Sequence, residues 1–199
     1  MHLFFPTPIW ITKINNSESI NTELKDYIYK EKEKYPEGAK KSNVSGWHSD
    51  DFDLKSESLK NFIKEISQNI ESAIKDMGWD LEIQIVKITG MWSIINDKDA
   101  FNEKHHHGNS ALSAAYYVKA EKNAGNIVLF DPRQANVFHH PSSKDVNNLN
   151  AQVQSVTPKA GTLVLFPSYL EHKVNPNLSN EERIVISFNV ALIRKKDLL

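Results

Sequence analysis

The sequence predicts a mostly β domain with flanking helices, in which an antiparallel barrel or sandwich carries two N-terminal helices on one outer face. Three observations support this fold class. Two helix-like amphipathic segments lie in the first 80 residues, the segments after Trp79 are short and β-branched or alternating, and turn residues separate those segments. We expect one domain, 1–199, with a strand and supporting helices in 1–80 and the β core in 81–199.

The N-terminal segment Leu3–Ile14 is apolar and β-prone, with Pro6 and Pro8 near its start. Because proline cannot donate to a β ladder, this segment is expected to be an edge strand or to begin its strand after Pro8. Residues 39–55 are polar and rich in turn formers, which indicates a loop anchored by its aromatic residues.

Two helices are expected, from Ser17 to Tyr35 and from Ser56 to Met77. Apolar residues recur every three to four positions in both, which is typical of a helix that packs on a core. Either Ser17 or Ser19 can cap the first helix, and Gly78 stands where a C-terminal cap of the second belongs.

The strand-like segments of the second half are short and bounded by turn residues. They are residues 82–95, 111–118, 126–131, 151–157, 162–166, 171–175 and 183–194. The polar insert Pro132–Asn150, which contains Phe138, His139 and His140, is too long for a simple hairpin loop. It is a candidate substrate lid, and the alternative is an ordinary surface loop.

Composition narrows the classes of function. With 24 Lys and Arg against 25 Asp and Glu, nothing in the charge balance indicates a nucleic-acid partner. No apolar run approaches ~20 residues, and the N-terminus lacks the pattern of a signal peptide, so we expect no membrane partner and a cytoplasmic protein. Cysteine is absent, so any metal must be held by His, Asp or Glu.

Three consecutive histidines, His105 to His107, end one segment before a polar turn. On a strand, residues i and i+2 point to the same side, so His105 and His107 can reach one point while His106 faces away. A third histidine, His172, follows an apolar strand further along the chain. Together they predict a three-ligand metal face that leaves the opposite side open. The alternatives are a polyhistidine turn without metal and a one-residue slip that makes His106 the ligand.

Arg183 begins the last strand-like segment, in which Arg183, Val185 and Ser187 share one face. An arginine that points into a barrel needs an anion, because burying an unpaired guanidinium is very costly. A bidentate carboxylate is the natural partner, and the Ser187 hydroxyl can add a hydrogen bond. The alternative is a surface residue paired with Glu181 or Glu182.

These motifs resemble a known family. The pattern H-x-H at a strand end, a strand ending in Tyr-Tyr, and then H-x10-R-x3-S resembles the iron(II)/2-oxoglutarate-dependent oxygenases of the prolyl-hydroxylase type. More narrowly, FPTPIW, GWHSDDF, MWSIIN, HHHGNSALSAAYYV and VLFDPR resemble, in that order, a 2-oxoglutarate oxygenase family of marine bacteria and their phages. The resemblance implies a double-stranded β-helix (jelly roll, cupin-like) for 81–199. It also implies Fe(II), 2-oxoglutarate and O2 as cofactor and cosubstrates. If the protein is phage-encoded, its expected location is the host cytoplasm.

The resemblance also implies residue roles. His105 matches the first iron ligand and His172 the last. Arg183 would pair with the far carboxylate of 2-oxoglutarate, Ser187 falls where a supporting hydroxyl often sits, and Tyr117 matches a strand tyrosine that touches the same carboxylate.

The sequence departs from the family pattern at the second ligand, where H-x-D is general and this chain has His107. The third ligand is then His107, a water molecule or Asp131. Three neutral histidines would leave the metal site more positive than two histidines and a carboxylate.

The implied function is a dioxygenase that hydroxylates an unidentified substrate, with peptidyl proline as one example, and releases succinate and CO2. Its partners would be the small-molecule cosubstrate and a peptide or protein substrate, and a homodimer remains open. One alternative is a cupin-like three-histidine metalloprotein that does not use 2-oxoglutarate. Another is a non-catalytic binding module built on the same barrel.

Overall fold

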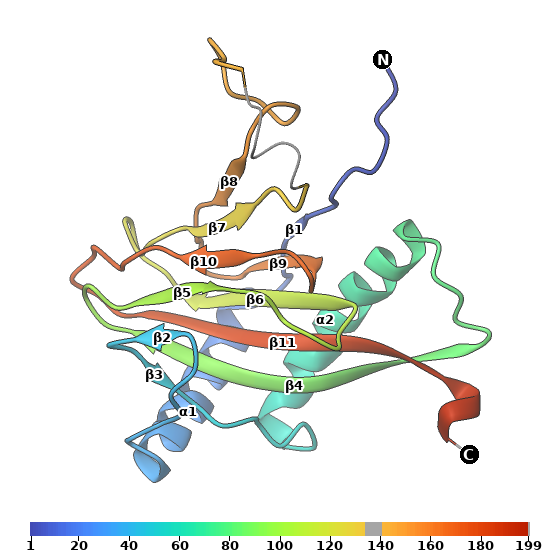
Figure 1. Cartoon of the computed structure of the whole chain (residues 1–199). Helices are drawn as coiled ribbons and strands as arrows, with labels where there is room; N and C mark the ends of the chain where they lie inside the picture. The colour runs from blue at the N-terminus through green and yellow to red at the C-terminus, as the bar shows by residue number, and fades with distance from the viewer. Residues whose placement is uncertain (134–140, 199) are drawn as a thin grey trace.

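The computed structural model describes residues 1–133 and 141–198. Two antiparallel sheets face each other, and two helices cover the outer face of the larger sheet (Figure 1). This is the jelly-roll arrangement that the sequence predicts. Phe138, His139 and His140 of the expected lid lie outside the described residues.

The larger sheet has the order β1-β9-β6-β11-β4-β3. Its strands are β1 (Trp10–Lys13), β9 (Thr162–Pro167), β6 (Leu112–Lys119), β11 (Arg183–Arg194), β4 (Gln84–Asn96) and β3 (Trp47–His48). The smaller sheet has the order β2-β5-β10-β7-β8. Its strands are β2 (Asn43–Val44), β5 (Phe101–His105), β10 (His172–Val174), β7 (Ile127–Phe130) and β8 (Val153–Val156). As expected, β1 begins after Pro8 and lies at a sheet edge.

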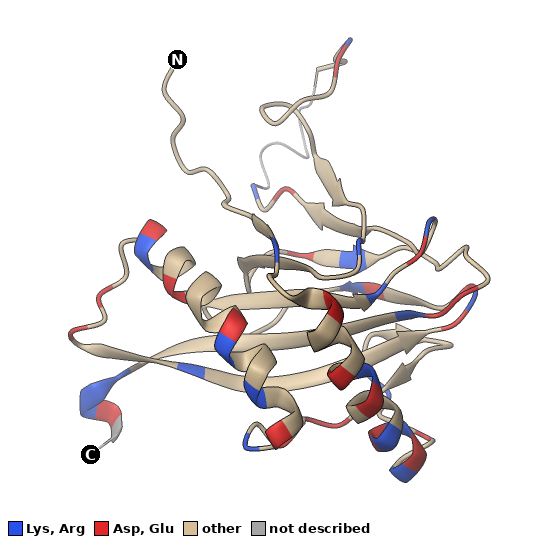
Figure 2. Cartoon of the chain, turned by 180° about the vertical axis from the view of Figure 1, so that it is seen from behind, with Lys and Arg blue, Asp and Glu red and all other residues tan. Residues whose placement is uncertain are grey.

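The helices α1 (Ser17–Lys34) and α2 (Glu57–Asp76) bury their apolar faces on the larger sheet and turn their charged residues to solvent (Figure 2). The predicted glycine cap of α2 is confirmed, because Gly78 has a φ of +65° and its N–H donates to the Lys75 carbonyl at 3.0 Å. The predicted serine cap of α1 is wrong. Asn16 occupies the cap position with a φ of +50°, and Ser17 is the first helical residue.

Side-chain alternation along β11 divides the core into two layers. Ile184, Ile186 and Phe188 pack towards the helices. Val185 lies on the other side, in a second apolar cluster between the two sheets. This cluster also contains residues of β6, β7 and β9, so the two sheets are held together by side chains that meet between them.

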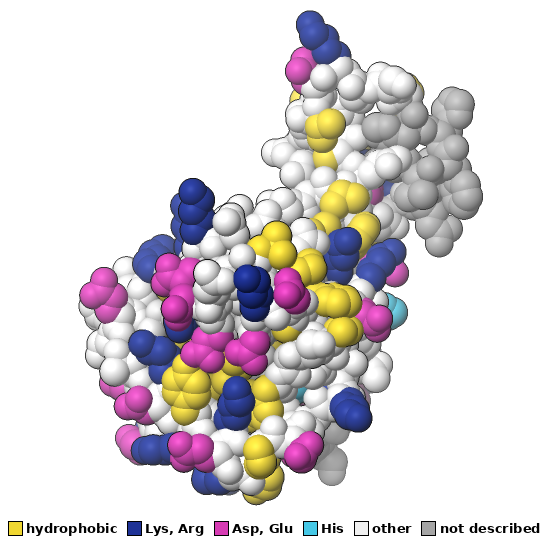
Figure 3. Space-filling model, turned by 90° about the vertical axis from the view of Figure 1, so that its left-hand side faces the viewer, with side chains coloured by type: hydrophobic (Ala, Val, Ile, Leu, Met, Phe, Trp, Pro, Cys, Tyr) yellow, Lys and Arg dark blue, Asp and Glu magenta, His cyan; other side chains and the backbone are white. Residues whose placement is uncertain are grey.

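Each of the expected strand segments corresponds to one strand of the structure. These strands are β4 and β6 to β11. The expected loop 39–55 is partly wrong, since it holds the two-residue strands β2 and β3, and the first of these pairs with β5. Within residues 1–133 and 141–198, no helix combines the length and apolar character needed to cross a membrane. Lys, Arg, Asp and Glu side chains are interspersed on the face that Figure 3 shows.

Candidate functional site

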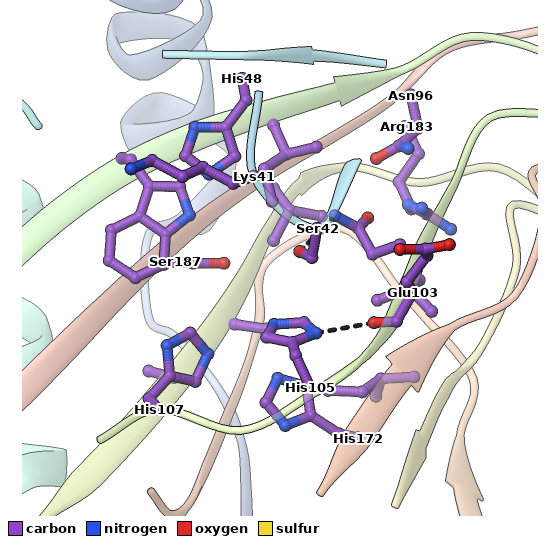
Figure 4. Close-up of a pocket in the computed structure, with 18 of the residues that line it drawn as sticks. Lys41, Ser42, His48, Asn96, Glu103, His105, His107, His172, Arg183 and Ser187 are labelled. Atoms are coloured by element: carbon purple, nitrogen blue, oxygen red, sulfur yellow. Dashed lines mark hydrogen bonds between the residues drawn. The ribbon is translucent and has the colours of Figure 1, made fainter. Parts of the chain in front are cut away.

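A cavity of about 670 Å³ lies between the two sheets. Its walls come from β4, β6 and β11 of the larger sheet, from β5 and β10 of the smaller sheet, and from the segment 41–51 (Figure 4). The histidines of the sequence pattern lie at one part of this cavity, and Arg183 lies at another.

The structure brings His105, His107 and His172 together. One ring nitrogen from each lies within 4.8 Å of the other two. Strand pairing causes this, because His105 ends β5 and is the register partner of His172 at the start of β10. His107 follows two residues later, and its backbone N–H donates to the Ser168 carbonyl at 3.0 Å.

The two residues named as alternative ligands lie elsewhere. His106 is exposed and does not belong to the histidine cluster, so the one-residue slip is wrong. Asp131 is also outside the cluster, and its carboxylate accepts hydrogen bonds from Arg133 Nε at 2.9 Å and Nη2 at 2.7 Å.

Backbone carbonyls orient two of the rings. His105 Nδ1 lies 2.7 Å from the Glu103 carbonyl oxygen (Figure 4), and His172 Nδ1 lies 2.9 Å from that of Leu170. A carbonyl oxygen only accepts, so both Nδ1 atoms carry the proton and both Nε2 lone pairs are free. This is the arrangement that carbonyl partners impose on metal-binding histidines.

Burial keeps the rings neutral. It lowers the pKa of His107 to about 4 and that of His172 to about 3, with the neighbouring histidines adding to both shifts. The pKa of His105 is also lowered, again mainly by burial. Neutral imidazoles suit Fe(II) as well as other transition metals, so this donor set fits iron.

These shifts predict that the metal-free protein loses stability as the pH falls. The pKa of His172 is lower in the folded chain than its ordinary 6.5, so the unfolded chain binds more protons below that pH. The contribution of the neutral His172 ring to the free energy of unfolding is fully present above about pH 7. Acidification to pH 5.5 lowers the free energy of unfolding by about 1 kcal/mol through His172 alone. Urea unfolding with a chelator at both pH values measures this loss. A His172→Gln variant should lose less, and a free energy that stays level would contradict the prediction.

Arg183 is 1% exposed, so the predicted alternative of a surface ion pair is wrong. Its Nη1 donates to the carbonyls of Ala124, of Gly125 at 3.1 Å and of Asn175 at 3.3 Å. Among the described residues, its Nε and Nη2 have no hydrogen-bond partner. Burial lowers the pKa of Arg183 to about 10, so the group is still a cation at neutral pH. The cavity is therefore lined by a buried cation, two of whose nitrogen donors have no hydrogen-bond partner among the described residues.

Gly125 makes room for this guanidinium. Its φ is +86°, and a Cβ there would collide with the Asn175 carbonyl oxygen and lie 2.7 Å from Arg183 Nη1. We expect Gly125→Ala to lower the free energy of unfolding by more than about 2 kcal/mol, because backbone strain and steric overlap add. Gly78→Ala is the matched control, since Gly78 has a φ of +65° and open space around its Cβ position. Equal losses in urea unfolding would contradict the clash.

Neighbouring strands extend the cavity wall. Val185 is the register partner of Tyr117, and Ser187 is the partner of Ala115, so these residues share the face that carries Arg183. Tyr117 is fully buried, and burial raises its pKa to about 12. Its hydroxyl therefore keeps its proton at neutral pH and can donate.

Sequence reasoning missed another part of the wall. His48 in β3 stacks on Trp92 with ring centroids 5.8 Å apart, and Trp92 lies 5.7 Å from His107. Lys41 and Asp50 also line the cavity. We expected a loop here, anchored by its aromatic residues. The available signals were that Trp92 shares a face of the expected strand with Ile94, and that His48 and Trp92 stand in the quoted motifs GWHSDDF and MWSIIN.

Comparison with protein families places the chain beside known oxygenases. The model of a family described as "Putative 2OG-Fe(II) oxygenase" matches residues 90–189. These residues include the three clustered histidines and Arg183. A search of curated proteins found no match.

Solved structures share the fold at low sequence identity. A prolyl-4-hydroxylase from Pseudomonas putida is 15% identical, with 95% of this chain and 94% of that chain covered and a TM-score of 0.64. HygX from Streptomyces hygroscopicus, with nickel, 2-oxoglutarate and hygromycin B bound, is 10% identical over 93% and 83% of the two chains, with a TM-score of 0.64. A Trichoplax adhaerens prolyl hydroxylase in complex with a peptide fragment of the hypoxia-inducible factor is 14% identical over 95% and 84%, with a TM-score of 0.61.

Proposed function

The chain belongs to the 2OG-Fe(II) oxygenase family, and from this premise we propose that it hydroxylates a C–H bond at the expense of 2-oxoglutarate and O2. Fe(II), 2-oxoglutarate and O2 are the cofactors and cosubstrates of this family. The proposed reaction converts substrate, 2-oxoglutarate and O2 into hydroxylated substrate, succinate and CO2. One oxygen atom enters the substrate and the other enters succinate.

The first part of the proposal concerns the metal. His105, His107 and His172 would hold Fe(II), since their ring nitrogens lie within 4.8 Å of one another and their lowered pKa values keep the lone pairs available. When bound, the iron would supply O2 activation coupled to decarboxylation of 2-oxoglutarate. The protein would supply position and a cavity that limits access of water.

The second part concerns the cosubstrate, and the observation that carries the proposal is the unsatisfied guanidinium of Arg183. Its Nε and Nη2 lack partners among the described residues, and Arg183 lines the cavity that also holds the histidine cluster. A carboxylate accepts two parallel hydrogen bonds from such a fork. The far carboxylate of 2-oxoglutarate would bind there, with the hydroxyls of Tyr117 and Ser187 as additional donors.

For the primary substrate we propose a peptidyl side chain, with proline as the first candidate. The support is the fold, which is shared with prolyl hydroxylases, one of them in complex with a peptide. The segment 41–51 forms the wall over which such a substrate would enter, and His48 and Trp92 would contact it near His107.

Uncoupled turnover tests the proposal without knowledge of the substrate. Purified protein with Fe(II), 2-oxoglutarate and O2 should form succinate slowly, and the same protein treated with a chelator should form none. Proline-rich peptides should then raise the rate if they are substrates. Absence of succinate, together with absence of an absorption band on anaerobic addition of Fe(II) and 2-oxoglutarate, would leave a cupin-like metalloprotein or a binding module.

A further inference from the structure

Asn96 is the last residue of β4, and its side-chain amide is buried. The proposed function assigns no role to this residue. It is 0% exposed, and neither Nδ2 nor Oδ1 has a hydrogen-bond partner among the described residues. Burying an amide without partners costs on the order of 1–3 kcal/mol. A polar side chain in this state requires a partner that the described residues do not supply, such as a ligand, an ion or a water molecule.

Strand register places this amide beside Arg183. The two residues are direct partners in the antiparallel pair of β4 and β11, so their side chains leave the sheet on the same face. Both line the cavity. In Figure 4 Asn96 lies next to Arg183 and apart from the three histidines.

The unsatisfied atoms of the protein are concentrated at this pair. Within residues 1–133 and 141–198, the buried side-chain atoms without partners are Nδ2 and Oδ1 of Asn96, Nε and Nη2 of Arg183, and Oε1 of Gln84. Gln84 lies at the opposite end of β4, outside the cavity lining. The neighbouring Asn177 shows what a structural amide looks like. It is equally buried, but its Nδ2 donates to the carbonyls of Asn96 at 2.9 Å and Glu181 at 2.7 Å.

We propose that Asn96 is a further cosubstrate-binding residue, which completes the site for the far carboxylate together with Arg183. This inference rests on the proposed function. The Asn96 Nδ2–H groups donate to carboxylate oxygens, which have about four acceptor positions, of which the arginine fork fills two. Oδ1 of Asn96 cannot face the carboxylate, because both are acceptors. On binding, it would accept the Nη2–H that the fork does not use, a hydrogen bond that is not formed without the ligand.

Two substitutions separate a ligand-binding amide from a structural one. Asn96→Ala removes the donor and should raise the Kd for 2-oxoglutarate about tenfold. Asn96→Asp places a carboxylate beside the free N–H groups of Arg183. The new side chain should take the place of the ligand, so the Kd should rise at least about 100-fold while the metal-free protein melts at a higher temperature. Gln84→Ala, on the same strand, is the matched control and should leave the Kd unchanged.

The measurement is anaerobic titration of the Fe(II)-loaded protein with 2-oxoglutarate, followed by the absorption band of the complex. A second ligand, 2-oxopentanoate, has the same chain length without the far carboxylate. Its affinity should be the same in wild type and in Asn96→Ala, because the lost contact is to the missing group.

The outcomes are distinct. If the wild-type protein binds no 2-oxoglutarate, the proposed function fails and this inference fails with it. If the wild type binds and both Asn96 variants bind within twofold of it, only the role of Asn96 is overturned. Wild-type affinity for 2-oxoglutarate in Asn96→Asp alone would also overturn it, because a carboxylate beside the free N–H groups of Arg183 must compete with the ligand. Should Asn96→Ala not fold, Asn96→Asp decides alone.

Discussion

Arg183→Met is expected to weaken 2-oxoglutarate binding by roughly 100- to 4,000-fold. Truncating one partner of a buried, hydrogen-bonded charge pair costs about 3–5 kcal/mol, because the other charge is left without compensation. The methionine should not prevent folding, since it fills similar volume and removes a cation whose Nε and Nη2 have no partner among the described residues. The Kd follows from anaerobic titration of the Fe(II)-loaded variant.

The control for this experiment lies on the same strand. Arg194 is exposed at the far end of β11, so Arg194→Met should bind 2-oxoglutarate as the wild type does. If Arg183→Met binds 2-oxoglutarate with wild-type affinity, the guanidinium does not hold the cosubstrate. Full metal-dependent activity in that variant would favour the cupin-like reading, which needs no arginine.

His107→Ala is expected to lower the affinity for Fe(II) by at least about 100-fold. Loss of residues that merely support a ligand costs 10- to 100-fold, so loss of a ligand itself should cost at least as much. His107→Asp should retain the metal, because two histidines and a carboxylate form the facial set typical of Fe(II) oxygenases. Competition with a chromogenic chelator measures both affinities.

The neighbouring histidine provides a matched control for position and chemistry. His106 is exposed and outside the cluster, so His106→Ala should bind Fe(II) like the wild type. Equal losses in His106→Ala and His107→Ala would show that the effect is local unfolding. Full retention of iron in His107→Ala would mean that His105 and His172 suffice, with water at the third position.

Elements with a strong side-chain period could be predicted from the sequence. The alternation in 183–194 predicts correctly which residues of β11 face the helices and which face the cavity. The 3–4 spacing predicts α2 to within a residue at either end. The strands β2 and β3 could not be predicted, because two residues carry no period and their partners, β5 and β4, are remote in sequence.

The site divides in the same way. The spacing of His105 and His107 encodes a common direction, and the structure places both beside His172. Asn96 ends the quoted motif MWSIIN, but its role could not be predicted, because in the sequence it is only the polar end of an apolar strand. Its meaning comes from the register with Arg183, which is set by pairing between residues 87 positions apart in the chain (183 minus 96). Likewise, His48 gains significance only when β3 pairs with β4.

The backbone contacts of Arg183 determine which positions around it should tolerate substitution. Nη1 contacts the backbone carbonyls of Ala124, Gly125 and Asn175, and side chains take no part in these bonds. A saturation library should therefore accept many residues at 175 provided that the turn persists, yet reject nearly every replacement of Gly125. Substitutions in this turn should therefore affect Arg183 through the backbone conformation, and much less through the chemical nature of the new side chain.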